Sequence, residues 1–110
     1  MPFTIRPFRR FPVSCPVTYK AGVCEGHGTV WNLSLTGWQF SGNLPLRVGD
    51  VCSLTVNLSL DQRVDVAAGV VRWVRGEAYG VETLVFEDES RDDLVAYLWH
   101  RLAESRRADR

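Results

Sequence analysis

Hydrophobic and polar residues alternate along most of the chain with a two-residue period, which is typical of β-strands that bury one face. The pattern is clearest in segment 51–60, where Leu54, Val56, Leu58 and Leu60 alternate with polar residues. Six segments are predicted to be strands: 13–20, 28–31, 38–41, 51–60, 63–75 and 78–86. Strands at such regular spacing favour an antiparallel arrangement.

Proline, glycine and polar residues interrupt this alternation and predict local features. Pro16 has no N–H group, so we expect it at a sheet edge or on the outer, unpaired side of its strand. Residues 21–26 are predicted to form a turn, as are Asp61 and Gln62. The alternation slips at residues 67–69, which indicates a bulge or a barrel corner.

Near the end of the chain the period changes to that of a helix. Its apolar face is predicted to consist of Leu94, Val95, Leu98, Trp99 and Leu102. Ser90 and Asp93 have the spacing of a capping box at the helix start, and basic residues 106–107 lie at its end. We therefore expect a mainly β fold, a six-stranded antiparallel barrel or strongly bent sheet with one C-terminal helix packed on it.

Length and composition favour one cytoplasmic domain with a packed core. The chain has 110 residues, of which 45% are hydrophobic and 24% charged. It contains neither a long apolar run nor the apolar stretch of a secretory signal. Three widely spaced cysteines, Cys15, Cys24 and Cys52, are expected to be reduced and buried.

The distribution of charged residues along the chain is more informative than the net charge. Thirteen basic and thirteen acidic residues give a net charge of zero, which argues against a general binder of nucleic acid or of membrane surfaces. The first twenty residues, however, contain Arg6, Arg9, Arg10 and Lys20 and no acidic residue. A local cationic patch on a neutral protein suits an anionic ligand of limited size.

Two segments offer polar groups suited to such a ligand. In the first, Arg6, Arg9 and Arg10 surround Phe8, and Pro7 stiffens the backbone. An arginine side chain can donate two parallel hydrogen bonds to a phosphate or to the edge of guanine. The second segment, residues 32–37, carries amide and hydroxyl groups that can read a base edge or cap their own turn.

Taken in this order, the two segments resemble the signature of the PilZ family of receptors for the bacterial second messenger cyclic diguanylate (c-di-GMP). Arg6 and Arg10 fit the R-x-x-x-R motif, and Asn32, Ser34 and Gly37 fit [D/N]-x-S-x-x-G. Residues 46–50, 69–73 and 79–82 also look like the family. The resemblance covers nearly the whole chain and implies a six-stranded split barrel with a C-terminal helix, as the periodicity does.

The resemblance also implies roles for these residues. Arg6 and Arg10 would hold the phosphates and guanine edges of c-di-GMP, Asn32 and Ser34 would hydrogen-bond a guanine, and Gly37 would keep the turn open. Arg9 is a third candidate outside the motif spacing. Trp38 follows the motif glycine directly, and two interpretations stay open: stacking on a guanine or packing in the core.

These roles suggest a binding mechanism and a division of the chain. Residues 1–12 form the arginine-rich ligand-binding segment, residues 13–106 the barrel with its helix, and residues 107–110 a tail. We expect residues 1–11 to be mobile until ligand phosphates neutralise the arginines and fold the segment onto the barrel. The changed surface would then signal to an effector protein. The sequence leaves open whether the chain forms a homodimer.

Other functions are less well supported by the sequence. A small barrel with surface aromatics such as Trp31, Trp38 and Trp73 can also act as a protein-interaction or single-strand nucleic-acid module, without c-di-GMP. Cys24 and His27 have metal-ligand spacing but no second pair, so we expect no metal or cofactor. No triad or similar arrangement supports an enzyme.

Overall fold

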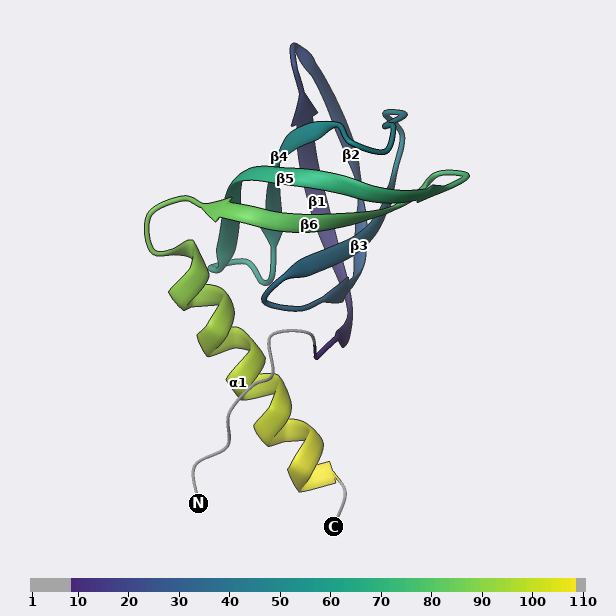
Figure 1. Cartoon of the computed structure of the whole chain (residues 1–110). Helices are drawn as coiled ribbons and strands as arrows, with labels where there is room; N and C mark the ends of the chain where they lie inside the picture. Colours follow the sequence, from purple (N-terminus) through teal and green to yellow (C-terminus); the bar gives the residue numbers. More distant parts are fainter. Residues whose placement is uncertain (1–8, 109–110) are drawn as a thin grey trace.

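The chain folds into a closed six-stranded antiparallel barrel with one helix at its C-terminal end, as the sequence predicted (Figure 1). The computed structural model describes residues 9–108, and side chains up to residue 104. The elements are β1 (Phe11–Ala21), β2 (Cys24–Leu33), β3 (Gly37–Gly42), β4 (Val51–Asn57), β5 (Arg63–Arg75), β6 (Ala78–Phe86) and α1 (Ser90–Ala108). The strands are hydrogen-bonded in the order β1-β2-β3-β6-β5-β4, and pairing of β4 with β1 closes the barrel.

Inward-facing residues of all six described strands fill the barrel. Tyr19, Phe40 and Tyr79 form an aromatic cluster, with ring centroids 4.9–6.4 Å apart. The Tyr19 hydroxyl donates to the carbonyl of Leu44 at 2.7 Å, so this buried polar group keeps a partner. Burial of the apolar faces is the main source of stability for such a small domain.

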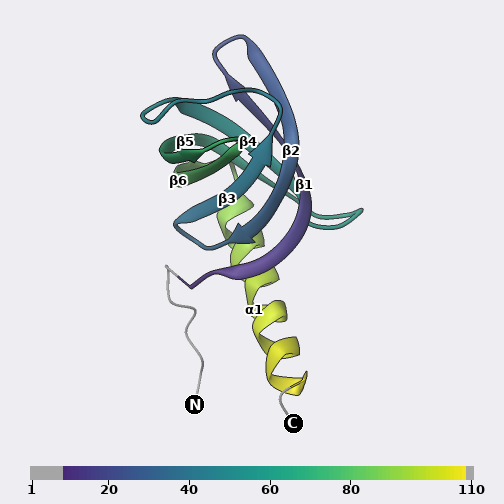
Figure 2. The ribbon, with the colours of Figure 1, turned by 90° about the vertical axis from the view of Figure 1, so that its right-hand side faces the viewer.

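Helix α1 lies against one end of the barrel, where it packs on β5 (Figures 1 and 2). Leu94, Leu98 and Leu102 are buried, whereas Trp99, predicted on the same face, is 36% exposed. The guanidinium of Arg101 donates to the carbonyl of Pro12 at 2.8 Å and ties the helix to the start of β1.

The predicted capping box is not formed. The Ser90 hydroxyl instead accepts a hydrogen bond from the backbone N–H of Asp65 at 2.9 Å, and the Asp93 N–H donates to the carbonyl of Glu89. Because this hydroxyl is 25 residues from its partner in the sequence, spacing within the helix carried no signal of the contact.

The turn predicted for residues 21–26 is shorter in the structure. Strand β2 begins at Cys24, so the turn is only Gly22 and Val23, with Gly22 at a φ of 62°. The glycines beyond it belong to the strand. A Cβ at Gly26 would clash with the Tyr19 ring and the Leu44 side chain, so glycine here makes room for neighbouring side chains rather than for a turn.

Strand β4 ends three residues earlier than the alternation predicted. The N–H groups of Leu58 and Ser59 both donate to the carbonyl of Gln62, which closes the chain into a turn. Leu60, expected on the buried face, is fully exposed. Turn formation through these backbone bonds overrides the hydrophobic alternation.

The structure also tests the predictions for Pro16, for the bulge in β5 and for the three cysteines. Pro16 pairs with Thr29 of β2, but the pairing of β1 with β4 begins only at Val17, so the proline occupies an unpaired side of β1 as expected. The register between β5 and β6 shifts around Ala68, which confirms the predicted bulge. Cys15 and Cys52 are buried, but Cys24 is exposed beside the hairpin turn, contrary to expectation.

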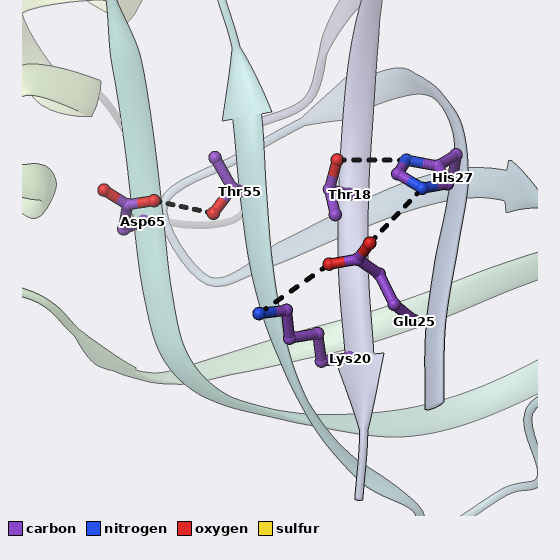
Figure 3. Close-up of polar contacts among 6 residues, drawn as sticks. All are labelled: Thr18, Lys20, Glu25, His27, Thr55 and Asp65. Atoms are coloured by element: carbon purple, nitrogen blue, oxygen red, sulfur yellow. Dashed lines mark hydrogen bonds and ion pairs between the residues drawn. The ribbon is translucent and has the colours of Figure 1, made fainter. Parts of the chain in front are cut away.

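The outer face of β1, β2, β4 and β5 carries polar groups that pair across strands (Figure 3). Lys20 and Glu25 lie 3.7 Å apart, and Glu25 is 3.5 Å from His27. Lys20 is therefore separated from the arginines with which the sequence grouped it, because an extended strand carries it to the far end of β1. The cationic group of the described residues at the start of β1 consists of Arg9 and Arg10.

Candidate functional site

The turn between β2 and β3 is built around the buried hydroxyl of Ser34. Its Oγ accepts hydrogen bonds from the N–H groups of Gly37 at 3.0 Å and Thr36 at 3.3 Å, and it donates to the carbonyl of Gly37 at 2.9 Å. The turn is also bound to β6, because the N–H of Thr83 donates to the carbonyl of Thr36. Ser34 thus caps its own turn and fixes the shape of the surface around it.

Asn32 and Gly37 flank this turn in different ways. The amide Nδ2 of Asn32 donates to Oε1 of Gln39 at 3.0 Å across the β2–β3 pair. Gly37 begins β3, where a Cβ would lie 3.0 Å from the carbonyl of Val81 on β6. Its role is close strand approach, since its φ is not in the left-handed region.

A shallow pocket of about 180 Å³ opens beside this turn, and we call it the arginine pocket. Its lining residues are Arg10, Ser34, Thr36, Gly37, Trp38, Gln39, Arg72, Trp73, Gly80, Val81 and Glu82. The strand register explains why Arg10 belongs to it. Phe11 pairs with Leu33, so continuing this antiparallel pairing brings Arg10 to Ser34.

The structure brings some predicted site residues together and separates others. Arg10, Ser34, Gly37 and Trp38 line the arginine pocket, and Asn32 contacts it through Gln39. Arg6 lies outside the described residues. The guanidinium carbon of Arg9 lies 5.1 Å from the centroid of the Phe11 ring, and Arg9 is not among the lining residues.

Trp38 is a core residue. Only 1% of its surface is exposed, and its Nε1 has no hydrogen-bond partner among the described residues. It pairs with Val81 of β6 and forms the floor beneath the turn. The suggestion that Trp38 is a surface aromatic for single-strand binding is therefore wrong, because a tryptophan on the inward side of β3 fills the barrel.

The sequence reasoning missed the wall contributed by β5 and β6. Arg72 and Trp73 come from β5, and Glu82 comes from β6. Arg72 donates from Nε to Oε1 of Glu82 at 2.7 Å. Residues 69–73 and 79–82 were singled out only as resembling a family, and nothing in their spacing showed that they meet the N-terminal arginines.

The two buried thiols have little nucleophilic character at neutral pH. Burial raises the pKa of Cys52 to about 11, and it also raises the pKa of Cys15. A thiol protonated at neutral pH is a weak nucleophile and a weak metal ligand. Within residues 9–108, no three His, Cys, Asp or Glu side chains gather as a metal site, and no described helix is long and apolar enough to span a membrane.

Comparison with known proteins establishes the family. The family model of the PilZ domain matches residues 4–99, most of the chain, so the chain belongs to the PilZ domain family. No curated protein sequence matches it.

Two solved structures share the fold. The Bacillus subtilis inhibitor of motility (MotI/DgrA) superposes with a TM-score of 0.76 and 17% sequence identity, over 94% of this chain and 54% of its own. The chain therefore spans about half the length of that protein. The PilZ domain of CeSA from a cellulose-synthesizing bacterium gives a TM-score of 0.65 and 17% identity, over 84% of this chain and 99% of its own.

Proposed function

We propose that this chain is a receptor for cyclic diguanylate and that the arginine pocket is its binding site. The observation that carries the proposal is that Arg10 lines the same pocket as Ser34 and Gly37. These residues are 24 or more positions apart in the sequence and belong to the two motifs of the PilZ signature. Membership of the chain in that family supports the same ligand.

The arginine pocket is too small to enclose a cyclic dinucleotide, so the bound ligand would lie partly outside it and be covered by the arginine side chains. Sites that enclose a ligand of this size usually have volumes of several hundred Å³, and the arginine pocket has about 180 Å³. A cyclic dinucleotide would therefore rest one base on the barrel wall and leave its phosphates near the surface. Arg10, and Arg6 in the preceding segment, would then bind the phosphates.

The chain would act as an adaptor. Binding would hold the arginine segment against the barrel and change the surface next to the β2–β3 turn, which an effector protein in the bacterial cytoplasm would recognise. Phe11, predicted to be the last residue of the mobile segment, is instead 95% buried at the first position of β1 and already held on the barrel.

Isothermal titration calorimetry with c-di-GMP tests the proposal. Arg10→Ala should weaken binding by about ten- to a hundredfold, or roughly 1–3 kcal/mol, because a forked contact is lost. Arg63→Ala is the matched control: Arg63 is similarly exposed, but it pairs with Asp65 in a different pocket. We expect its affinity to equal that of the wild type.

The same titration separates this function from strand binding. GTP and a short oligonucleotide are tested in parallel at two salt concentrations, because binding of a nucleic-acid strand falls steeply with salt. Equal c-di-GMP affinity in Arg10→Ala and wild type, or salt-sensitive binding of the oligonucleotide alone, would refute the receptor function.

A further inference from the structure

Arg72 occupies a bulge in β5 that directs its side chain at the arginine pocket. In the pairing of β5 with β6, Val71 lies opposite Val81 and Trp73 lies opposite Gly80, so Arg72 has no partner of its own in the register. A bulge of this kind changes the direction of a side chain and is frequent beside binding sites. Here the redirected side chain lines the pocket that also contains Arg10.

The guanidinium of Arg72 is held by one oxygen of Glu82. Nε donates to Oε1 at 2.7 Å, and Nη2 forms an ion pair with the same oxygen. No residue of the described chain is a hydrogen-bond partner of Nη1. The guanidinium therefore keeps donors for a second anion while Glu82 fixes its position.

The Arg72–Glu82 ion pair is exposed enough for a ligand phosphate to approach Arg72 and compete with Glu82. The side chains of Arg72 and Glu82 are 60% and 44% exposed, and pairs at such positions contribute little to folding stability. Glu82 is also the acidic residue of the pocket lining. A ligand phosphate near Arg72 would gain the attraction of the arginine and meet the repulsion of the carboxylate.

We propose that Arg72 is a ligand-contacting arginine of the pocket and that Glu82 is its internal competitor, which lowers the affinity for an anionic ligand. The inference rests on the proposed c-di-GMP site and adds a second cationic contact, supplied by the barrel wall. Arg10 reaches the ligand from the start of β1, and Arg72 reaches it from β5. Arg72 thus adds a cationic contact from the barrel wall to those proposed for Arg6 and Arg10.

Calorimetry on four proteins tests this arrangement: wild type, Arg72→Gln, Glu82→Gln and the double variant. Arg72→Gln should weaken c-di-GMP binding by roughly tenfold, because a charged contact is lost. Glu82→Gln should strengthen it by about threefold, because the repulsion is removed. The double variant should bind more tightly than Arg72→Gln and less tightly than wild type, because it loses the charged contact and the repulsion together. Circular dichroism verifies that each variant is folded.

Arg75→Gln is the matched control on the same strand. Arg75 stacks over the Trp73 ring at 5.4 Å and is not part of the pocket lining, so its loss should leave affinity unchanged. Wild-type affinity in Arg72→Gln, or weaker binding by Glu82→Gln, would overturn the inference.

A second probe keeps this test independent of c-di-GMP itself. If wild type binds no c-di-GMP, the proposed function fails, and titration with inorganic pyrophosphate still tests the arginine. We expect pyrophosphate to shift the NMR signal of the Arg72 Nε–H group in wild type and, at lower concentration, in Glu82→Gln. An unshifted signal in both proteins would overturn the role of Arg72.

Discussion

Two pockets of the barrel each contain one of the two buried serines of the described chain, yet they differ in charge and construction. The arginine pocket has Ser34, Arg10 and Arg72, with Glu82 as its acid. The second, which we call the acidic pocket, is lined by Asp61, Gln62, Arg63, Asp65, Asp88, Glu89, Ser90 and Asp93. A chain of zero net charge therefore separates its charges into regions of opposite sign.

The two serines show how the pockets differ in construction. The hydroxyl of Ser34 bonds only within its own four-residue turn, whereas that of Ser90 joins the helix to β5. The Ser34 hydroxyl shapes the surface of the β2–β3 turn, and the Ser90 hydroxyl holds α1 and β5 together. An anion would be drawn to the pocket with the arginines and repelled from the one with the carboxylates.

The largest expected effect comes from removing the floor of the arginine pocket. Trp38→Ala should lower the free energy of unfolding by about 3–5 kcal/mol, because a buried indole leaves a cavity. Trp99→Ala, at a half-exposed position of α1, should change it by less than about 1 kcal/mol. Urea denaturation measures both, and equal losses would contradict the assignment of Trp38 to the core.

The next effect compares the two serines directly. Ser34→Ala should cost about 1–3 kcal/mol of unfolding free energy, because it leaves N–H groups of a buried turn without their acceptor. Ser90→Ala removes one hydrogen bond and should cost about 1 kcal/mol. Only Ser34→Ala should also weaken c-di-GMP binding. Denaturation and calorimetry on both variants would contradict this if Ser90→Ala proved the more damaging to the ligand site.

The smallest effect tests the backbone of the acidic pocket. Asp88 has a φ of 46°, a conformation that glycine adopts more readily than residues with a Cβ. Asp88→Gly should raise the unfolding free energy by about 0.5 kcal/mol, and Asp88→Ala should lower it by a similar amount. Thermal denaturation with both variants gives the sign, and stabilisation by alanine would show that charge rather than φ dominates at this position.

The sequence predicted the barrel well because strand periodicity and turn residues are local signals. It predicted β5 and its bulge, and it identified the turn at Ser34. It failed at Leu60, where backbone bonds to Gln62 end the alternation early. It also failed at Gly26, predicted in a turn, where glycine lies in β2 and makes room for the Tyr19 ring.

The candidate site was predicted only in part, because half of its wall comes from distant strands. The motifs supplied Arg10 and Ser34, which the antiparallel pairing of β1 and β2 then brings together. Arg72 and Glu82 meet only through the pairing of β5 with β6 and its bulge. A long-range register of this kind leaves no mark in the spacing of residues along one strand.

Closure of the barrel limits how another protein can recognise this domain. Each of the six described strands has a hydrogen-bonded neighbour on both sides along part of its length, so only short stretches, such as residues 11–16 of β1 on the side away from β2, lack a strand partner. Recognition by β-augmentation, in which a guest segment extends the host sheet, is thus confined to these short stretches. Most of the surface open to a binding partner therefore consists of side chains on the barrel wall, the loops and the helix, and those are the surfaces to scan when such a partner is sought.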